Sequence, residues 1–244
     1  MKIRAFVKVA LAFAGAMLGT SGFAADYTWT GLAGNGKWTD SGNWSPSGVP
    51  GCYLDGDVER GGDSADTATF GADASGADAV TIDLAGHRYV KDVVIASGAP
   101  AYTFGTSAAY AQSLGINTNG SIIVNKEVTK DQNFPWVRVN SNGATTFSNN
   151  STASTFRFGP LDSIQRKDGK STGGYPYASL SLKGTGDFDM DGGCQFDQCG
   201  SFNVLTSGKL TLNDKSGTGA RYSVYYFQSI NGSVHEVELP TVTS

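Results

Sequence analysis

The amino-acid sequence predicts an all-β protein whose strands stack as a parallel β-solenoid, with a β-sandwich as the alternative. Short runs in which apolar and polar residues alternate follow one another along the chain, and turn-forming residues separate them. No stretch shows the sustained i, i+3, i+4, i+7 apolar spacing of an amphipathic helix. Charged residues, the usual material of helix surfaces, make up only 16% of the chain, whereas glycine contributes 33 of 244 residues.

Residues 1–24 have the features of a secretory signal peptide. A positively charged start precedes an uncharged apolar run over residues 9–18, and small residues follow. Gly22 and Ala24 suit the −3 and −1 sites of a signal peptidase, so we expect cleavage after Ala24, with Ala25 as the second choice. The run is shorter than the ~20 residues that span a bilayer, and no later run is long enough. We therefore expect export, with no membrane span after cleavage.

Residues 25–75 form a segment rich in Trp, Gly, Asp and Pro, in which Trp29, Trp38 and Trp44 are the notable side chains. One interpretation is a glycan-binding platform, because exposed indole rings stack on sugars. The other is a cap, because the open end of a solenoid exposes apolar surface and unpaired backbone groups. The position at the start of the body favours the cap, since terminal repeats need a cover.

Residues 76–244 are predicted to be the β-solenoid body. The turns are not dominated by two-residue Asn-Gly hairpins, which favours stacked coils over a sandwich. In stacked coils, each strand buries its apolar face against the next coil. The strand candidates are 79–84, 89–95, 121–124, 136–139, 145–147, 155–158, 179–182, 187–191, 202–205, 209–212, 222–230 and 234–239.

Several short motifs follow one another in the tryptophan-rich segment. They are Tyr27-Thr28-Trp29-Thr30-Gly31, Gly36-Lys37-Trp38, Asn43-Trp44, Val49-Pro50-Gly51, Gly62-Asp63 and Asp66-Thr67-Ala68-Thr69-Phe70. This order resembles the N-terminal start of large bacterial surface proteins that carry autotransporter-associated β-strand repeats. Residues 79–104 and 180–193 are similar to the strand–turn–strand repeats of that family. The resemblance implies a right-handed parallel β-helix displayed outside the cell.

The net charge of the chain argues against two classes of partner. All 22 acidic residues but only 15 of the 18 basic ones lie after the signal, so the mature chain has a net charge of −7. This argues against a nucleic-acid partner and against docking on anionic lipid.

We expect Cys194 and Cys199, which are near in sequence, to form a disulfide in an oxidising compartment. The third cysteine, Cys52, is then a free thiol or pairs with another chain.

Asp187, Asp189, Asp191 and Gly192 spell D-x-D-x-D-G, which matches the opening of a calcium loop. The twelfth position is Gln198, where a bidentate Glu is usual, so calcium is the less favoured interpretation. Alternation along a strand also explains the pattern, with Phe188 and Met190 inward and the aspartates outward. We therefore expect no cofactor, with calcium at these aspartates as the exception.

The leading functional hypothesis is an exported structural or adhesive β-helix, secreted or on the cell surface, that contacts a glycan or a surface protein. It is not expected to be an enzyme, and no catalytic residues are predicted. The first alternative is a carbohydrate-binding module. The second is a polysaccharide lyase or hydrolase, for which Asp187 and Asp189 would be the acid pair.

Overall fold

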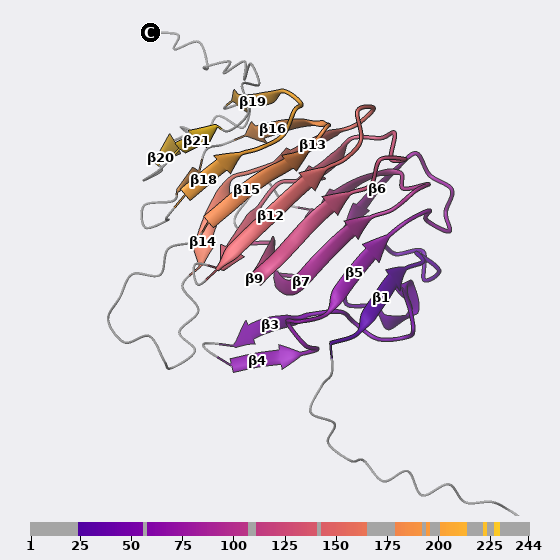
Figure 1. The fold of residues 1–244 in the computed structure, drawn as a ribbon. Coiled ribbons are helices and arrows are strands. Elements are labelled where there is room, and N and C mark those ends of the chain that lie inside the picture. Colours follow the sequence, from indigo (N-terminus) through magenta and orange to yellow (C-terminus); the bar gives the residue numbers. More distant parts are fainter. Residues whose placement is uncertain are drawn as a thin grey trace, which may run out of the picture.

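The structure, a computed structural model, describes residues 24–55, 58–106, 111–140, 143–164, 179–191, 194–195, 201–213, 222–223 and 227–229. Within these residues the chain is all-β, as predicted, and the one helical element is a 3-10 turn at Ser41–Asn43. The strands lie side by side in long rows (Figure 1). They are β1 (Asp26–Trp29), β2 (Trp44–Ser45), β3 (Cys52–Asp55), β4 (Val58–Gly61), β5 (Thr67–Phe70), β6 (Ala79–Ile82), β7 (His87–Ile95), β8 (Ala101–Phe104), β9 (Ser113–Val124), β10 (Gln132–Phe134), β11 (Val137–Asn140), β12 (Ala144–Asn149), β13 (Thr155–Phe158), β14 (Leu161–Ile164), β15 (Ser179–Gly184), β16 (Asp187–Asp191), β17 (Cys194–Gln195), β18 (Ser201–Val204), β19 (Leu210–Asn213), β20 (Tyr222–Ser223) and β21 (Phe227–Ser229).

Parallel pairing produces three rows of strands, which we name the long row, the six-strand row and the third row. The long row runs β1, β5, β7, β9, β12, β15, β18 and β21. The six-strand row runs β6, β8, β10, β13, β16 and β19. The third row uses the first halves of β7 and β9, followed by β11, β14, β17 and β20.

The chain visits the three rows in a repeating order. From β5 it passes to β6 in the six-strand row and then to the first half of β7 in the third row. It returns to the long row in the second half of β7, and the cycle repeats through β8 and β9 and again through β10, β11 and β12. Antiparallel pairs among the described strands are limited to β1 with β2 and to β3 with β4 and β7. This pairing differs from the antiparallel sheets of the sandwich alternative.

The strands β7 and β9 each serve two rows because they bend part-way along. The register of β7 against β9 shifts between Val90 and Asp92. In β9 the bend falls at Asn119, whose φ of 58° lies in the left-handed region that asparagine tolerates. The next residue, Gly120, lies so close to the Lys91 carbonyl oxygen that a Cβ would collide with it. The Asn-Gly pair therefore marks a corner between two rows rather than a hairpin turn.

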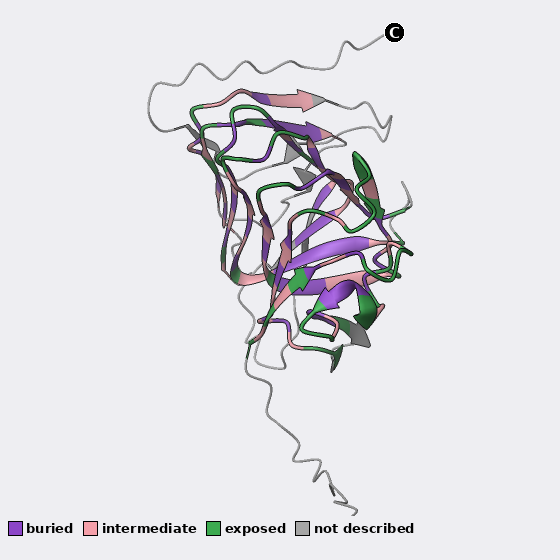
Figure 2. Cartoon of the chain, turned by 90° about the vertical axis from the view of Figure 1, so that its right-hand side faces the viewer, coloured by how far each residue is buried: buried purple, intermediate pink, exposed green. Residues whose placement is uncertain are grey.

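Inward side chains form one continuous hydrophobic core that extends from Trp29 to Leu210. The core contains a column of phenylalanine rings, in which Phe70 of the long row is followed by rings from paired strands of the six-strand row. The centroid distances are 4.8 Å from Phe70 to Phe104 and 4.5 Å from Phe104 to Phe134. The column continues at 4.9 Å to Phe156 and 5.4 Å to Phe188. Buried residues lie mainly on the strands and exposed ones mainly in the turns (Figure 2). The core crosses the predicted boundary between residues 75 and 76 without interruption.

Two fully buried amides hold the turns between the long row and the six-strand row. Gln132 donates to the carbonyl oxygens of Pro100 and Lys130, both at 2.9 Å. Asn149 donates to the carbonyl oxygens of Ser154 and Asp187, also at 2.9 Å each. These contacts give donors to carbonyl oxygens where the chain passes between the two rows; a buried carbonyl without a donor would cost about 1–3 kcal/mol.

The tryptophan-rich segment covers the leading strand of two rows. In the long row, β2 pairs with β1 and sets Trp44 opposite Trp29. At the six-strand row, the Trp38 N–H donates to the Asp83 carbonyl oxygen at 2.9 Å, and the Asp83 N–H donates to the Gly36 carbonyl oxygen at 2.8 Å. The segment therefore pairs backbone groups just beyond β6 as well as those of β1.

The sequence located most strands within one or two residues. Residues 155–158 and 187–191 are strands with the predicted bounds, and 222–230 divides into β20 and β21 within the described residues. The candidate 121–124 covers only the end of β9, and the candidates omitted β1, β2, β3, β4, β5, β8, β10, β14 and β17. Each omitted strand is only two to four residues long, so it gives little periodicity to detect. The candidate at 234–239 lies outside the described residues.

Replacing Phe134 by Ala should lower the free energy of unfolding by about 3–5 kcal/mol, because the ring is fully buried between two neighbours of the column. The matched control is Asn133→Ala, on the outward side of the same strand, which should change it by less than about 0.5 kcal/mol. Urea unfolding of both variants measures the difference. Equal effects would contradict the placement of Phe134 in the core.

Candidate functional site

The three tryptophans singled out in the sequence form a buried cluster. Trp29, Trp38 and Trp44 are 1%, 0% and 4% exposed, and their rings lie 4.9 to 5.1 Å apart around Trp44. Each indole N–H is satisfied internally: that of Trp29 by the Asp73 carboxylate at 2.8 Å, that of Trp38 by the Pro50 carbonyl oxygen, and that of Trp44 by the Trp38 carbonyl oxygen. No ring face is open to a sugar, so the stacking interpretation does not fit this packing.

The aspartates of the D-x-D-x-D motif lie along β16 in the six-strand row. Asp187 is exposed and accepts a hydrogen bond from the Lys209 N–H at 2.8 Å. Asp189 is only 8% exposed, contrary to the expectation of an open carboxylate, because it lies beside Arg157 on the next strand, with Nε–Oδ2 at 3.6 Å. In the part of the chain that the structure describes, no three His, Cys, Asp or Glu side chains are grouped to hold a metal ion. Gly192 and Gln198 of the motif lie outside that part.

Two other sequence predictions fall outside the described residues. Cys194 begins β17, but its side chain and Cys199 are not described, so the disulfide stays a prediction. Cys52 is fully buried in β3. Residues 1–23 of the signal are also not described, and the described chain begins at Ala24.

The outward face of the long row carries a line of polar side chains in register. Adjacent strands place Ser121 beside Asp92, with an Oγ–Oδ1 hydrogen bond of 2.7 Å. Further along, the Asn203 amide donates to the hydroxyls of Ser179, Ser181 and Ser201 at 3.2 to 3.3 Å. The line consists of Asp26, Thr67, Asp92, Ser121, Thr146, Ser181 and Asn203. Parallel strands space it at about 4.8 Å per step.

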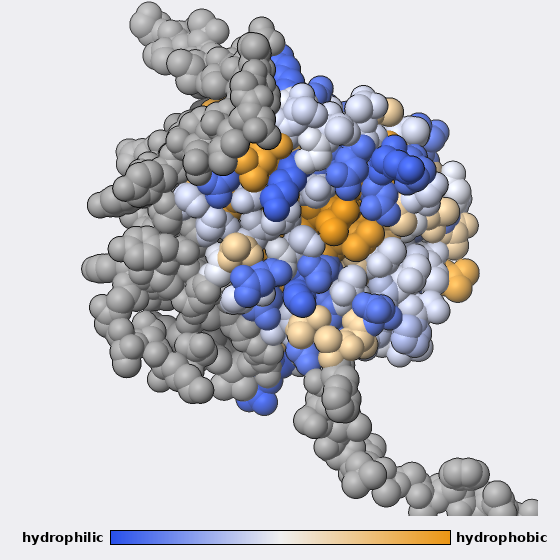
Figure 3. All heavy atoms as spheres, in the orientation of Figure 1, coloured by the Kyte–Doolittle hydropathy of each residue, from blue (hydrophilic) through white to orange (hydrophobic). Residues whose placement is uncertain are grey.

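A second outward line beside it contains Val94 and Ile123, both half-buried. Figure 3 views this face and shows a small hydrophobic area surrounded by hydrophilic side chains. Such a surface offers regularly spaced hydroxyl, amide and carboxylate groups with a limited apolar patch. It suits contact with an extended polar partner better than it suits chemistry on a small substrate.

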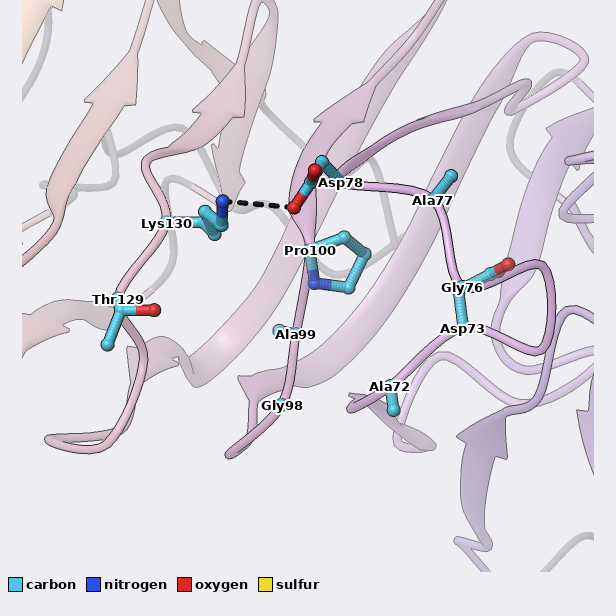
Figure 4. A pocket seen from close by; sticks show the side chains of 10 residues that line it. All are labelled: Ala72, Asp73, Gly76, Ala77, Asp78, Gly98, Ala99, Pro100, Thr129 and Lys130. Carbon is cyan, nitrogen blue, oxygen red and sulfur yellow. Dashed lines mark ion pairs between the residues drawn. The ribbon is translucent and has the colours of Figure 1, made fainter.

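A cavity of about 260 Å³ lies where the turns after β5, β7 and β9 stack on one another. Pro100 and neighbouring alanines give it an apolar floor, and Lys130 and Asp78 form an ion pair of 3.0 Å at its side (Figure 4). Asp73 lies on the opposite wall. Burial raises the pKa of Asp73, but hydrogen bonds from Ser75 and Trp29 outweigh it and leave the pKa below its ordinary value. The carboxylate is therefore ionised at neutral pH.

One contact that the sequence did not reveal joins His87 to Ser113. Nδ1 of His87 lies 2.8 Å from Oγ of Ser113, because the two residues are paired in register on β7 and β9. The two residues are 26 positions apart in the sequence, so no local motif signals the contact. Ser113 is only 1% exposed, so its hydroxyl is not presented to a substrate. Burial and the nearby positive charge of Arg138 both lower the pKa of His87, which favours the neutral ring.

The lowered pKa predicts how His87 affects stability with pH. The unfolded chain takes up a proton near the ordinary pKa of 6.5, and the folded chain takes it up only at lower pH. Stability should therefore fall as pH drops below about 6.5. The variant His87→Gln removes this contribution, so it should lose less stability than the wild type between about pH 7 and about pH 5. Urea unfolding across that range tests this, and parallel pH dependences would contradict it.

Comparison of the chain with protein-family models, with curated proteins and with solved structures finds no match. Within the described ranges, no helix has the length and apolar character needed to cross a bilayer.

Proposed function

We propose that this chain is an exported structural or adhesive module, secreted or displayed on the cell surface, that contacts a glycan or a surface protein and catalyses no reaction. In this proposal the three rows are the faces of a parallel β-solenoid, and the tryptophan cluster caps its leading end. The right-handed sense comes from the resemblance to proteins with autotransporter-associated β-strand repeats. The export component rests on the features of residues 1–24.

The observation that carries the proposal is the repeating order in which the chain visits the three rows. Each cycle adds one strand to every row in parallel register, as the second half of β7, β8 and the first half of β9 do. A stack of this kind grows in one dimension and presents flat, regularly spaced faces. The line of polar side chains along the long row is such a face, and we assign the adhesive contact to it.

The assignment of the contact to the long row predicts which substitutions weaken adhesion. Thr146→Lys with Ser181→Lys changes two adjacent steps of the polar line, and it should weaken binding to polysaccharide- or protein-coated surfaces about tenfold. The matched control, Thr81→Lys with Thr103→Lys, changes two adjacent steps on the six-strand row and should leave adhesion intact. Both variants keep inward residues unchanged, so they should fold.

The measurement combines two readouts on the full chain expressed in a bacterium. Cell fractionation should find the protein outside the cytoplasm. Beads coated with the purified protein should adhere to polysaccharide- or protein-coated surfaces. Retention in the cytoplasm would contradict export. Equal loss of adhesion in the two double variants, or no adhesion of the unaltered protein, would contradict the role of the long row.

A second candidate function, binding of a neutral sugar, is favoured by the cavity beside Pro100. The ion-paired Asp78 and Lys130 retain acceptor and donor sites for neighbouring hydroxyls, and the proline ring and alanines provide an apolar floor for a sugar face. Asp73 provides a further acceptor and is itself hydrogen-bonded by the Trp29 indole. A ligand that contacts Asp73 should therefore alter tryptophan fluorescence.

Titration with neutral oligosaccharides should produce a saturable change in tryptophan fluorescence if this cavity binds sugar. Lys130→Ala should weaken the response about tenfold or more, because it removes the charged donor at the cavity. Lys126→Ala is the matched control: Lys126 is also a surface lysine in an ion pair, with Glu127, but it does not line the cavity. An unaffected response in Lys130→Ala, or none in the wild type, would exclude this candidate.

A further inference from the structure

The carboxylate of Asp66 lies at the start of β5, directly beside the first residues of the described chain. Asp66 is 2% exposed. Its Oδ1 accepts a hydrogen bond from the main-chain N–H of Ala25 at 2.9 Å. Its Oδ2 accepts from the N–H groups of Gly51 at 3.0 Å and Asp63 at 3.3 Å. The side chain therefore joins three segments at one buried point.

Both main-chain polar groups of Ala25 are hydrogen-bonded at this point. Its carbonyl oxygen accepts a hydrogen bond from the Thr67 N–H at 2.9 Å, and the pairing of β1 with β5 begins at the next residue, Asp26. Ala24, by contrast, is exposed. Residue 25 is thus the first residue fixed by the sheet, and residue 25 is also the first residue of the chain after the expected cleavage.

No cation forms an ion pair with Asp66 among the described residues, although buried carboxylates are usually paired with a positive group. In the uncleaved chain the partner at Ala25 is a neutral amide. Hydrolysis of the Ala24–Ala25 peptide bond changes this partner. Water adds across the bond, so that Ala24 leaves with a carboxylate and the nitrogen of Ala25 becomes an α-ammonium with three N–H donors.

We propose that the α-ammonium released at Ala25 by a signal peptidase binds the buried Asp66 carboxylate and strengthens the folded state. This inference rests on the export component of the proposed function, and it adds a site that cleavage itself completes. The contact with the Ala25 amide is charge-assisted through the carboxylate alone, whereas the α-ammonium adds the opposite charge and turns the contact into an ion pair at a largely buried carboxylate. The processed chain is therefore more stable than a chain that carries even one additional residue at its N-terminus.

The effect depends on pH through the α-amino group. Pairing with Asp66 raises the pKa of this group in the folded state above its unfolded value of about 7.7–8.0. The added stability is then fully present below that value and is lost as pH rises through the folded pKa. The other titratable groups beside the contacting residues are Asp26 and Tyr27 on β1, Cys52 on β3, Asp63 before β5, and Lys91 and Asp92 on β7. All of them are present in both forms of the chain, so the comparison cancels them.

The test compares the processed chain that begins at Ala25 with an otherwise identical chain that begins at Ala24. At about pH 6, below the ordinary α-amino pKa, the chain beginning at Ala25 should melt about 2–4 °C higher. The difference should vanish in alkali and in the Asp66→Asn variant. The matched control Asp63→Asn also alters a carboxylate of this loop, one that caps the Ala65 N–H at 2.9 Å, and it should preserve the difference.

N-terminal sequencing of the exported protein separates the two proposals. If the exported protein keeps residues 1–24, export stands and this inference fails; if the protein stays uncleaved in the cytoplasm, both fail. If cleavage falls at another bond, export stands and the Asp66 site is wrong. If cleavage falls after Ala24 but the two chains melt at the same temperature, or Asp66→Asn destabilises both by the same amount and keeps their difference, only the site is overturned.

Discussion

The in-register stacking of inward side chains between parallel strands is the constraint on which the rest of this structure depends. Parallel pairing places chemically equivalent positions directly above one another, so a ring on one strand meets a ring on the next, as Phe104 and Phe134 do at 4.5 Å. Such contacts contribute more than the buried area of each ring alone. A slip of one residue would turn the whole inward set to solvent. The phenylalanine column therefore fixes the register of the outward lines as well.

Polar side chains where the chain turns between rows provide hydrogen bonds that the apolar side chains of the core cannot. A chain that turns between rows leaves carbonyl and N–H groups without strand partners, and these must be satisfied inside. Gln132, Asn149 and Asp66 each join two or three segments by side-chain hydrogen bonds to the main chain. Such residues are fully or almost fully buried although they are polar, which explains why composition alone gave no sign of their role.

The sequence was informative where a feature depends on neighbours along the chain. Alternation over residues 155–158 and 187–191 predicted those strands with the observed bounds, and the position of the tryptophans favoured a cover over a sugar platform. It was uninformative where a feature depends on the neighbouring strand of a row, which is distant in the sequence. The His87–Ser113 contact and the burial of Asp189 beside Arg157 both arise from strand register. Register is set by loop lengths that local periodicity does not reveal.

The same stacking bears on function. Aromatic and aliphatic side chains occupy the inward positions and are buried there. Groups that bind a partner can therefore lie only on the outward lines and in the stacked turns. The outward line of the long row offers hydroxyls and amides that already bond one another, as Asn203 and Ser181 do. Such groups are positioned in advance, which lowers the ordering cost when a partner binds. They are also spread along a flat face rather than converging on one reacting atom, and catalysis requires that convergence. This contrast is why we favour adhesion along the face over a reaction at one point.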